Sequence, residues 1–437
     1  MPESLTITAS AIDPGLLDLP WATPLGEWPS STIVSLPKGL SRHLVRFANL
    51  SGRVVAVKET TEAMATREYE MLGNLQRLDV PCVERVAVIA GRSGKNGTTL
   101  PAALVTAHLR FSMPYRALFT GVLKPDTANR LVDALAVLMV RLHNIGFYWG
   151  DVSLSNTLFR RDAGAFAAYL VDAETGELHE SGLTEGQRLY DLDLARTNIA
   201  GEIFDLAAGG RLEESVDAIA IADRLVSSYH SLWHELTDQE TFPLTESWRI
   251  TERVARLNAL GFDIDEMSIQ TTNDGTTVVI QPKVVDAGHH ARRLLRLTGL
   301  DVEENQAQRL LNDLDEFRAR SARVSSDEEM AAHEWLTRVF EPVVKAIPFE
   351  LRAKLEPAEV FHQVLEHRWY MSQARGSSVP LAEALSSYIS TVLRHRRDEA
   401  TIMGPPTETT TLPMIDVDAL GEADEDDEDT GDWRDRV

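Results

Sequence analysis

Three polar side chains in the middle of the sequence have the types and spacing that phosphate chemistry needs. Asp151 and Asn156 form the pattern D-x-x-x-x-N, and the apolar run 168–171 leads directly to Asp172. An amide and a carboxylate of this kind can hold Mg²⁺ on nucleotide phosphates, while the first aspartate faces an attacking hydroxyl. The pattern predicts phosphoryl transfer, with Asp151 as the catalytic residue and Asn156 and Asp172 as metal ligands. The alternative for Asp151 is a turn-forming aspartate that caps its own loop.

A lysine far upstream stands in the kind of strand that such a site requires. The run Val55-Ala56-Val57-Lys58 is rich in β-branched residues and follows a Ser51-Gly52 turn signal, which predicts a strand. Residues 66–78 have apolar side chains at helical spacing, and Glu68 lies near the start of that helix. The helix can bring Glu68 back to Lys58, and the pair would hold the lysine extended toward the phosphates.

The order of these motifs along the chain resembles the protein-kinase-like superfamily, most closely its lipopolysaccharide-kinase (Kdo/heptose kinase)-like branch. The resemblance covers roughly residues 33–208 and is carried by Val55–Lys58, Arg67–Leu72, Leu142–Gly146, Gly150–Asn156 and Val171–Asp172. It implies an α+β, bilobal protein-kinase-like fold, in which a small antiparallel β-sheet lobe precedes an α-helical lobe. It also implies ATP and Mg²⁺ as cofactors and a hydroxyl group as the phosphate acceptor.

The sequence departs from the family pattern at three places. Residues 37–41 stand where the glycine-rich loop is expected, Trp149-Gly150 replaces His-Arg before the catalytic aspartate, and Ala173-Glu174 replaces Phe-Gly after Asp172. The missing arginine removes the usual partner of a phosphorylated activation loop, so control by that route is not expected. The Gly-Asp pair is familiar in kinases of sugars and other small molecules, and it favours such an acceptor. Glu174 is either a second carboxylate on the metal or a solvated neighbour.

The reduced phosphate loop still offers three candidate nucleotide contacts. Lys38, Gly39 and Ser41 can present backbone amides and polar side chains to phosphate. The alternative is a simple hairpin loop. By its place in the order, the stretch 107–109 is expected to be the hinge beside the adenine, with His108 either an exposed loop residue or a nucleotide contact.

Two functions from different classes therefore remain open. The first is an atypical kinase-like phosphotransferase that moves the γ-phosphate of ATP to a hydroxyl of an unidentified acceptor. The second is a pseudokinase, a nucleotide-sensing or scaffolding module whose degenerate phosphate loop and altered metal motif have ended catalysis. Nucleic-acid binding is disfavoured by the net charge of −24, which also disfavours an anionic membrane surface.

Length and composition bound the organisation of the chain. At 437 residues the chain is too long for one ordinary core, and 43% hydrophobic residues is typical of globular proteins. The single cysteine, Cys82, fits a reducing compartment, and we see neither a signal sequence nor an apolar run that could span a bilayer. A cytoplasmic location is therefore expected. None of these patterns predicts an oligomeric state.

Changes in composition divide the chain into five segments. These are an irregular N-terminal arm (1–30), a kinase-like N-lobe (31–109), a kinase-like C-lobe (110–236), an α-rich domain (237–398) and an acidic disordered tail (399–437). Trp21 and Trp28 in the arm are expected to pack on the next domain. The α-rich segment resembles an uncharacterised domain found fused to such kinase-like regions in bacteria, and this resemblance implies no activity.

Several further residues have two interpretations each. The carboxylates of the stretch 188–196 either brace the catalytic loop from beneath or are helix-start charges, and His143 is either a hydrogen-bonding core residue or a partner of the helix dipole. A hairpin is expected over 268–280 around Asn273-Asp274-Gly275. The basic cluster 283–296 is expected to pair with acidic neighbours at an interdomain face, and the alternative is an anion-binding site.

Overall fold

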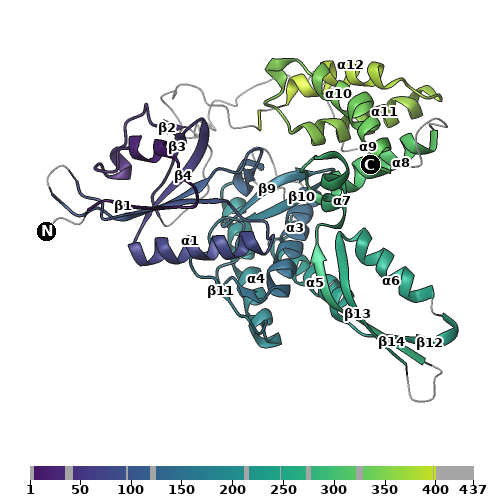
Figure 1. Cartoon of the computed structure of the whole chain (residues 1–437), viewed down its shortest axis with the longest axis horizontal. Helices are drawn as coiled ribbons and strands as arrows, with labels where there is room; N and C mark the ends of the chain where they lie inside the picture. The colour runs from purple at the N-terminus through teal and green to yellow at the C-terminus, as the bar shows by residue number, and fades with distance from the viewer. Residues whose placement is uncertain are drawn as a thin grey trace.

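The computed structural model describes residues 4–34, 43–94, 97–118, 125–210, 216–246, 248–271, 277–320, 328–396 and 398–399. The candidate phosphate loop with Lys38, Gly39 and Ser41, the turn Asn273–Gly275 and nearly all of the acidic tail lie outside these residues. Figure 1 shows a sheet-rich unit near the N-terminus, a central helical unit, and a C-terminal unit made of a projecting hairpin and a group of helices.

A six-stranded antiparallel sheet carries Lys58 and has the order β1-β5-β6-β4-β3-β2. Its strands are β1 (Thr6–Ala9), β2 (Ile33–Val34), β3 (Val45–Leu50), β4 (Arg53–Thr60), β5 (Arg85–Ala90) and β6 (Ala102–Ala107). The helix α1 (Glu62–Arg77) follows β4 directly, because the side chain of Thr61 accepts the backbone N–H of Met64 and so caps the helix. The helix begins four residues before the predicted start at residue 66.

The N-terminal arm is more regular than the sequence predicted. β1 pairs with β5, with Thr6 opposite Ala90, and the short 3-10 helices η1 (Pro14–Asp18) and η2 (Leu25–Glu27) follow. Trp21 and Trp28 are buried with their rings 5.2 Å apart, as expected for an arm that docks. The irregular-arm prediction is wrong for residues 6–9, because an edge strand of four residues is defined by its hydrogen bonds to β5 rather than by its own pattern.

The central unit contains the predicted catalytic loop. Its elements are β7 (Met113–Pro114), α2 (Tyr115–Leu118), α3 (Pro125–Asn144), β8 (Phe147–Tyr148), β9 (Thr157–Asp162), β10 (Ala165–Leu170), β11 (Glu177–Leu178), α4 (Glu185–Ala208) and α5 (Ala218–Thr237). The helix α3 packs against α5 and β10, and its leucine stripe lies in the largest core. Gly146, with φ of 83°, lies in the turn after α3, where a Cβ would meet the carbonyl of His179.

The C-terminal unit begins with a three-stranded antiparallel sheet of order β12-β14-β13 and continues as helices. Its elements are β12 (Glu240–Pro243), η3 (Leu244–Glu246), α6 (Trp248–Ala259), β13 (Phe262–Thr271), β14 (Thr277–Ala287), α7 (His289–Thr298), α8 (Glu304–Arg320), α9 (Glu328–Trp335), the π-helix η4 (Leu336–Phe340), α10 (Glu341–Ala346), η5 (Phe349–Leu351), α11 (Pro357–Arg375), α12 (Leu381–Thr391) and η6 (Leu393–His395). The helices share a second core built around Trp335, Phe361 and Tyr388.

Two predictions in this unit need correction. The domain expected to be α-rich over residues 237–398 begins with a sheet, in which β12 pairs with β14. The hairpin predicted over 268–280 extends from Phe262 to Ala287, so the first part of the basic cluster lies in β14. Both errors have one cause, because strand pairing between distant segments leaves little trace in local composition. Within the described residues, no helix is both long and apolar enough to cross a bilayer.

Candidate active site

One ammonium group and three carboxylates meet between the N-terminal sheet and the central unit. The Nζ of Lys58 lies 3.0 Å from Glu68 Oε2, 2.8 Å from Asp172 Oδ2 and 2.9 Å from Glu174 Oε2. Lys58 comes from β4, Glu68 from α1, and the other two from the segment that follows β10. The structure therefore brings Lys58, Glu68 and Asp172 together as the sequence predicted.

Local periodicity explains why Lys58 and Glu68 meet. On β4, Val55 and Val57 face the core that also holds the two arm tryptophans, so Lys58 lies on the opposite face of the sheet. On α1, Glu68 shares the buried face with Ala65 and Leu72, three and four residues away. The helix covers the Lys58 face of the sheet, and only 1% of Glu68 is exposed.

Charge is unevenly balanced in this cluster. Burial and the nearby carboxylate of Asp172 raise the pKa of Glu68 to about 7, despite its contact with Lys58. Burial acts to lower the pKa of Lys58, but Glu68 and Asp172 outweigh it and hold this pKa above its usual value.

Glu174 is not a solvated neighbour, because it contacts Lys58 and its Oε2 lies 3.2 Å from His43 Nε2. All three hydrogens of the lysine ammonium thus have carboxylate acceptors.

The predicted catalytic loop is held by its own side chains and tied to the Asp172 segment. Asn156 Nδ2 donates to the backbone oxygen of Asp151 at 2.9 Å and to its Oδ2 at 3.1 Å. The backbone N–H of Val171 donates to the carbonyl of Asn156 at 3.0 Å, and the indole of Trp149 donates to the carbonyl of Asp172 at 2.9 Å. Asp151, Asn156 and Asp172 therefore belong to one hydrogen-bonded unit.

The residues present fit a Mg²⁺ ion and nucleotide phosphates. Glu68, Asp172 and Glu174 each offer a carboxylate oxygen, and these oxygens lie within 4.8 Å of one another. Mg²⁺ prefers oxygen ligands, and Asn156 offers an amide oxygen next to the same segment. Three carboxylates around one ammonium leave excess negative charge, which a divalent cation would neutralise.

A buried aspartate on α4 supports the catalytic loop from beneath. Asp191 Oδ2 accepts the backbone N–H of Trp149 at 2.9 Å, and its Oδ1 accepts that of Gly150 at 2.8 Å. His143 lies between this carboxylate and Tyr229, with ring nitrogens 3.1 Å from Asp191 Oδ2 and 2.7 Å from the tyrosine Oη. The bracing interpretation holds for Asp191, and His143 is a hydrogen-bonding core residue.

Sequence reasoning missed a second brace. Glu202, also on α4, accepts the backbone N–H of Leu154 at 2.7 Å and that of Ser155 at 2.9 Å. Asn198, one turn earlier, donates to the carbonyl of Val152 at 3.0 Å. The sequence offers one indication of these contacts. Asn198 and Glu202 lie seven and eleven residues after Asp191, which places all three on the side of α4 that faces the loop.

Two backbone N–H groups of the predicted hinge donate hydrogen bonds to other parts of the protein. The N–H of Ala107 donates to the carbonyl of Glu84 at 2.8 Å, and that of His108 donates to the carbonyl of Val54 at 3.0 Å. The ring of His108 packs edge-on against Phe47, and burial lowers its pKa to about 4. His108 is therefore neutral at pH 7 and is not an exposed loop residue.

Four residues of the basic cluster pair with acids of their own unit. Arg292 contacts Asp263 at 2.7 Å, Arg293 contacts Glu328 at 2.5 Å, and His290 Nδ1 lies 2.6 Å from Glu304. His289 also contacts Asp263. Pairing with acidic neighbours was the expected interpretation, but the partners lie within the C-terminal unit rather than across an interdomain face.

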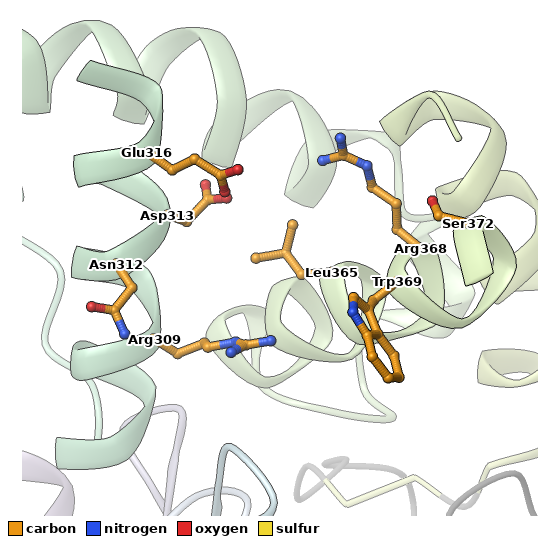
Figure 2. A pocket seen from close by; sticks show the side chains of 8 residues that line it. All are labelled: Arg309, Asn312, Asp313, Glu316, Leu365, Arg368, Trp369 and Ser372. Carbon is orange, nitrogen blue, oxygen red and sulfur yellow. The ribbon is translucent and has the colours of Figure 1, made fainter. Parts of the chain in front are cut away.

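A pocket of about 290 Å³ lies between α8 and α11. Its lining residues are Arg309, Asn312, Asp313, Glu316, Leu365, Arg368, Trp369 and Ser372, and Figure 2 shows the charged ends of the arginines and acids directed toward the space between the helices. The pocket contains none of the predicted site residues, and it combines charges of both signs.

Comparisons with known proteins divide the chain into two parts. The profile of the lipopolysaccharide kinase (Kdo/WaaP) family matches residues 48–197, and that of a domain of unknown function (DUF4032) matches residues 231–393. No sequence among the curated proteins matches the chain. The solved structure titled "WaaP in complex with acyl carrier protein" is 16% identical, with 52% of this chain and 88% of that chain covered and a TM-score of 0.32.

The fold class expected from the sequence is confirmed. The residues that match the kinase family include the Lys58 strand, α1, the predicted catalytic loop and Asp172. They extend from the sheet-rich lobe into the helical lobe. The second match covers the projecting hairpin and the C-terminal helices. The chain thus matches the lipopolysaccharide kinase (Kdo/WaaP) family over residues 48–197 and a domain of unknown function (DUF4032) over residues 231–393.

Proposed function

We propose that the chain is an ATP-dependent phosphotransferase that moves the γ-phosphate to a hydroxyl of a sugar or another small molecule. The observation that carries this proposal is the contact of Lys58 with both Glu68 and Asp172, at 3.0 and 2.8 Å. A lysine held by a helix glutamate beside an aspartate at the end of a strand is the arrangement that positions Mg-nucleotide phosphates in kinases. The family match over residues 48–197 supports the same reaction class.

Each site residue has a distinct role in this proposal. Lys58 neutralises phosphate charge, and Glu68 keeps its side chain extended. Asp151 orients the acceptor hydroxyl, and Asn156 fixes the Asp151 carboxylate through its amide NH₂ group. Asp172 and the amide oxygen of Asn156 would hold Mg²⁺, which when bound neutralises charge on the β- and γ-phosphates. Lys38, Gly39 and Ser41 are proposed as phosphate contacts on the sequence pattern alone.

The arrangement around Glu174 is specific to this chain. Because Lys58 already has three carboxylate partners, a phosphate oxygen can reach its ammonium only if one of them withdraws. Glu174 is the partner that would withdraw most easily, because Glu68 is buried on α1 and Asp172 also accepts the N–H of Glu174 at 3.1 Å. In this proposal Glu174 would leave Lys58 when nucleotide binds, and its carboxylate would then be available to hold the metal.

The chemistry also fits the cellular setting expected from the sequence. An ATP-dependent enzyme with one cysteine, Cys82, suits the reducing cytoplasm. Burial raises the pKa of Cys82 to about 12, so its thiol stays protonated and inert.

Turnover of Mg-ATP by the full chain tests the proposal, with a panel of sugars and small alcohols as acceptors. Asp151→Asn should lower turnover by about 10²–10⁴-fold while leaving Mg-ATP binding, followed by calorimetry, nearly unchanged. Asp193→Asn, an exposed change on α4, is the matched control. If the wild type binds Mg-ATP without turning it over with any acceptor, and Asp151→Asn changes nothing, the chain is a pseudokinase.

A further inference from the structure

The two halves of the candidate site are connected by one hairpin. β9 begins at Thr157, directly after Asn156, and β10 ends at Leu170, two residues before Asp172. The strands pair antiparallel, with Thr157 opposite Leu170 at the site end and Asp162 opposite Ala165 at the far end. Any displacement of this hairpin therefore moves both Asn156 and Asp172.

The C-terminal unit holds this hairpin through buried charges. Arg160 on β9 contacts Glu303 at 2.9 Å and Glu356 at 2.5 Å, and these two carboxylates precede α8 and α11 respectively. The hydroxyl of Tyr169 on β10 donates to Glu303 Oε1 at 2.7 Å. The side chains of Arg160 and both glutamates are at least four-fifths buried. Glu303 thus contacts both strands of the hairpin.

The far end of the hairpin caps a helix of the C-terminal unit. Asp162, only 3% exposed, accepts the backbone N–H of Gln306 at 2.7 Å and that of Asn305 at 3.2 Å, in the first turn of α8. A carboxylate in this position also favours the positive end of the helix dipole. The side chain of Gln306 returns a hydrogen bond to the carbonyl of Arg161 at 2.9 Å.

The N-terminal end of α11 and the end of the described chain complete the contact. Glu359 on α11 accepts the backbone N–H of Ala163 at 3.1 Å, and Arg161 forms a bidentate pair with Glu399 at 2.8 and 3.0 Å. Buried charges and helix ends accept few alternative geometries, because each displaced partner leaves an unpaired charge or N–H group behind. The contact therefore fixes one position of the hairpin rather than forming a sliding surface.

We propose that the C-terminal unit positions the active site: Glu303, Glu356 and the first turn of α8 hold the β9–β10 hairpin, and through it Asn156 and Asp172. Arg160, Asp162 and Tyr169 are positioning residues in this scheme, because they act on the site through the backbone of the hairpin. The same two helices, α8 and α11, border the pocket of Figure 2 further along their length. A change in the distance between these helices would therefore move the residues that contact the hairpin. The effect on turnover rests on the proposed phosphotransferase function.

Hydrogen exchange of the full chain, followed by mass spectrometry, tests the coupling without any need for turnover. Tyr169→Phe removes one hydroxyl and Glu356→Gln removes one charge, and neither changes the size of the side chain appreciably. We expect exchange in residues 151–156 and 171–174 to become about two- to tenfold faster, the range for one lost hydrogen bond. Arg318→Gln, which removes an exposed pair with Asp315 on α8, is the control and should leave these segments unchanged.

Separate outcomes decide the two proposals. If exchange rises in the hairpin 157–170 but stays unchanged in both site segments, the positioning role is refuted, whatever the activity. If exchange rises in the site segments but the wild type turns over no ATP, the positioning role stands and the phosphotransferase function fails. When turnover is present, Tyr169→Phe should lower kcat more than it raises KM for ATP, since a misplaced Asn156 and Asp172 affect the reacting geometry.

Discussion

Asp191 accepts the backbone N–H of Gly150 at 2.8 Å, and this contact relates the helix α4 to the residue directly before the candidate catalytic aspartate. Gly150 has φ of 76°, in the left-handed region, and a Cβ there would lie 3.0 Å from the Tyr148 ring. The loop thus needs glycine where the wider kinase pattern has arginine. The Gly-Asp pair is a consequence of the local backbone conformation, and Asp191 is the residue that stabilises it.

Asp191→Asn should destabilise the kinase-like part of the chain. The amide NH₂ group must face one of the N–H donors that Asp191 now accepts, which leaves a buried donor unsatisfied and costs about 1–3 kcal/mol. Urea denaturation followed by tryptophan fluorescence measures the loss. Asp193→Asn, two residues later on the exposed side of α4, should change the midpoint little. If both variants lost the same free energy of unfolding, the hydrogen bonds of Asp191 to the loop would not contribute to stability.

The contacts that the sequence predicted correctly are those that local periodicity determines. Lys58 and Glu68 are ten residues apart, on a strand and the helix that follows it, so the period of each element fixed which faces would meet. The contact of Lys58 with Asp172 is the exception, because these residues are 114 positions apart and their meeting was implied by the order of the motifs and the resemblance to kinases. For Lys58 and Glu68, a short segment contains most of the information.

The contacts that the sequence did not predict join segments far apart in the chain. The spacing of Glu202 from Asp191 places both on one face of α4, but the contact of Glu202 with Leu154 depends on how that helix packs against the loop. The pairing of Arg160 with Glu303 joins two units that local patterns can only describe separately. The density of basic residues in the sequence identified the cluster around Arg292. It could not show that Asp263 pairs with Arg292.

Glu174→Gln should strengthen the binding of ATP in the absence of divalent metal. The change removes one of the three carboxylates on the Lys58 ammonium, so a phosphate oxygen no longer competes with a charged side chain. We expect about a fivefold lower Kd by calorimetry in EDTA, equivalent to about 1 kcal/mol for one charge-assisted contact. The gain in affinity that Mg²⁺ provides should shrink, because a metal ligand is lost.

Glu177→Gln is the matched control for this prediction. Its side chain is 59% exposed and lies 3.8 Å from Arg67, so it carries the same charge change close to the site without contacting Lys58. An unchanged or higher Kd for Glu174→Gln in EDTA would mean that Glu174 does not compete with nucleotide for Lys58.

The raised pKa of Glu68 predicts how stability changes with pH. Its carboxyl has an ordinary pKa of 4.5 in the unfolded chain and a pKa of about 7 in the folded protein, so between these values the folded state binds more protons. The contribution of Glu68 is therefore fully present below pH about 4.5 and is lost as the pH rises through 7. Urea unfolding between pH 5 and 8, without metal or nucleotide, should show this loss with a slope of at most about 1.4 kcal/mol per pH unit.

Glu68→Gln separates this contribution from those of other groups. Glutamine stays neutral, so the variant should lose less stability than the wild type as the pH rises from 5 to 8. Asp162 has a pKa that burial and Glu303 raise to about 7, so it contributes in the same direction and should keep a residual slope in the variant. Asp162→Asn with Glu68→Gln should flatten the profile further. A Glu68→Gln profile as steep as that of the wild type would mean that Glu68 is ionised throughout this range, held so by Lys58.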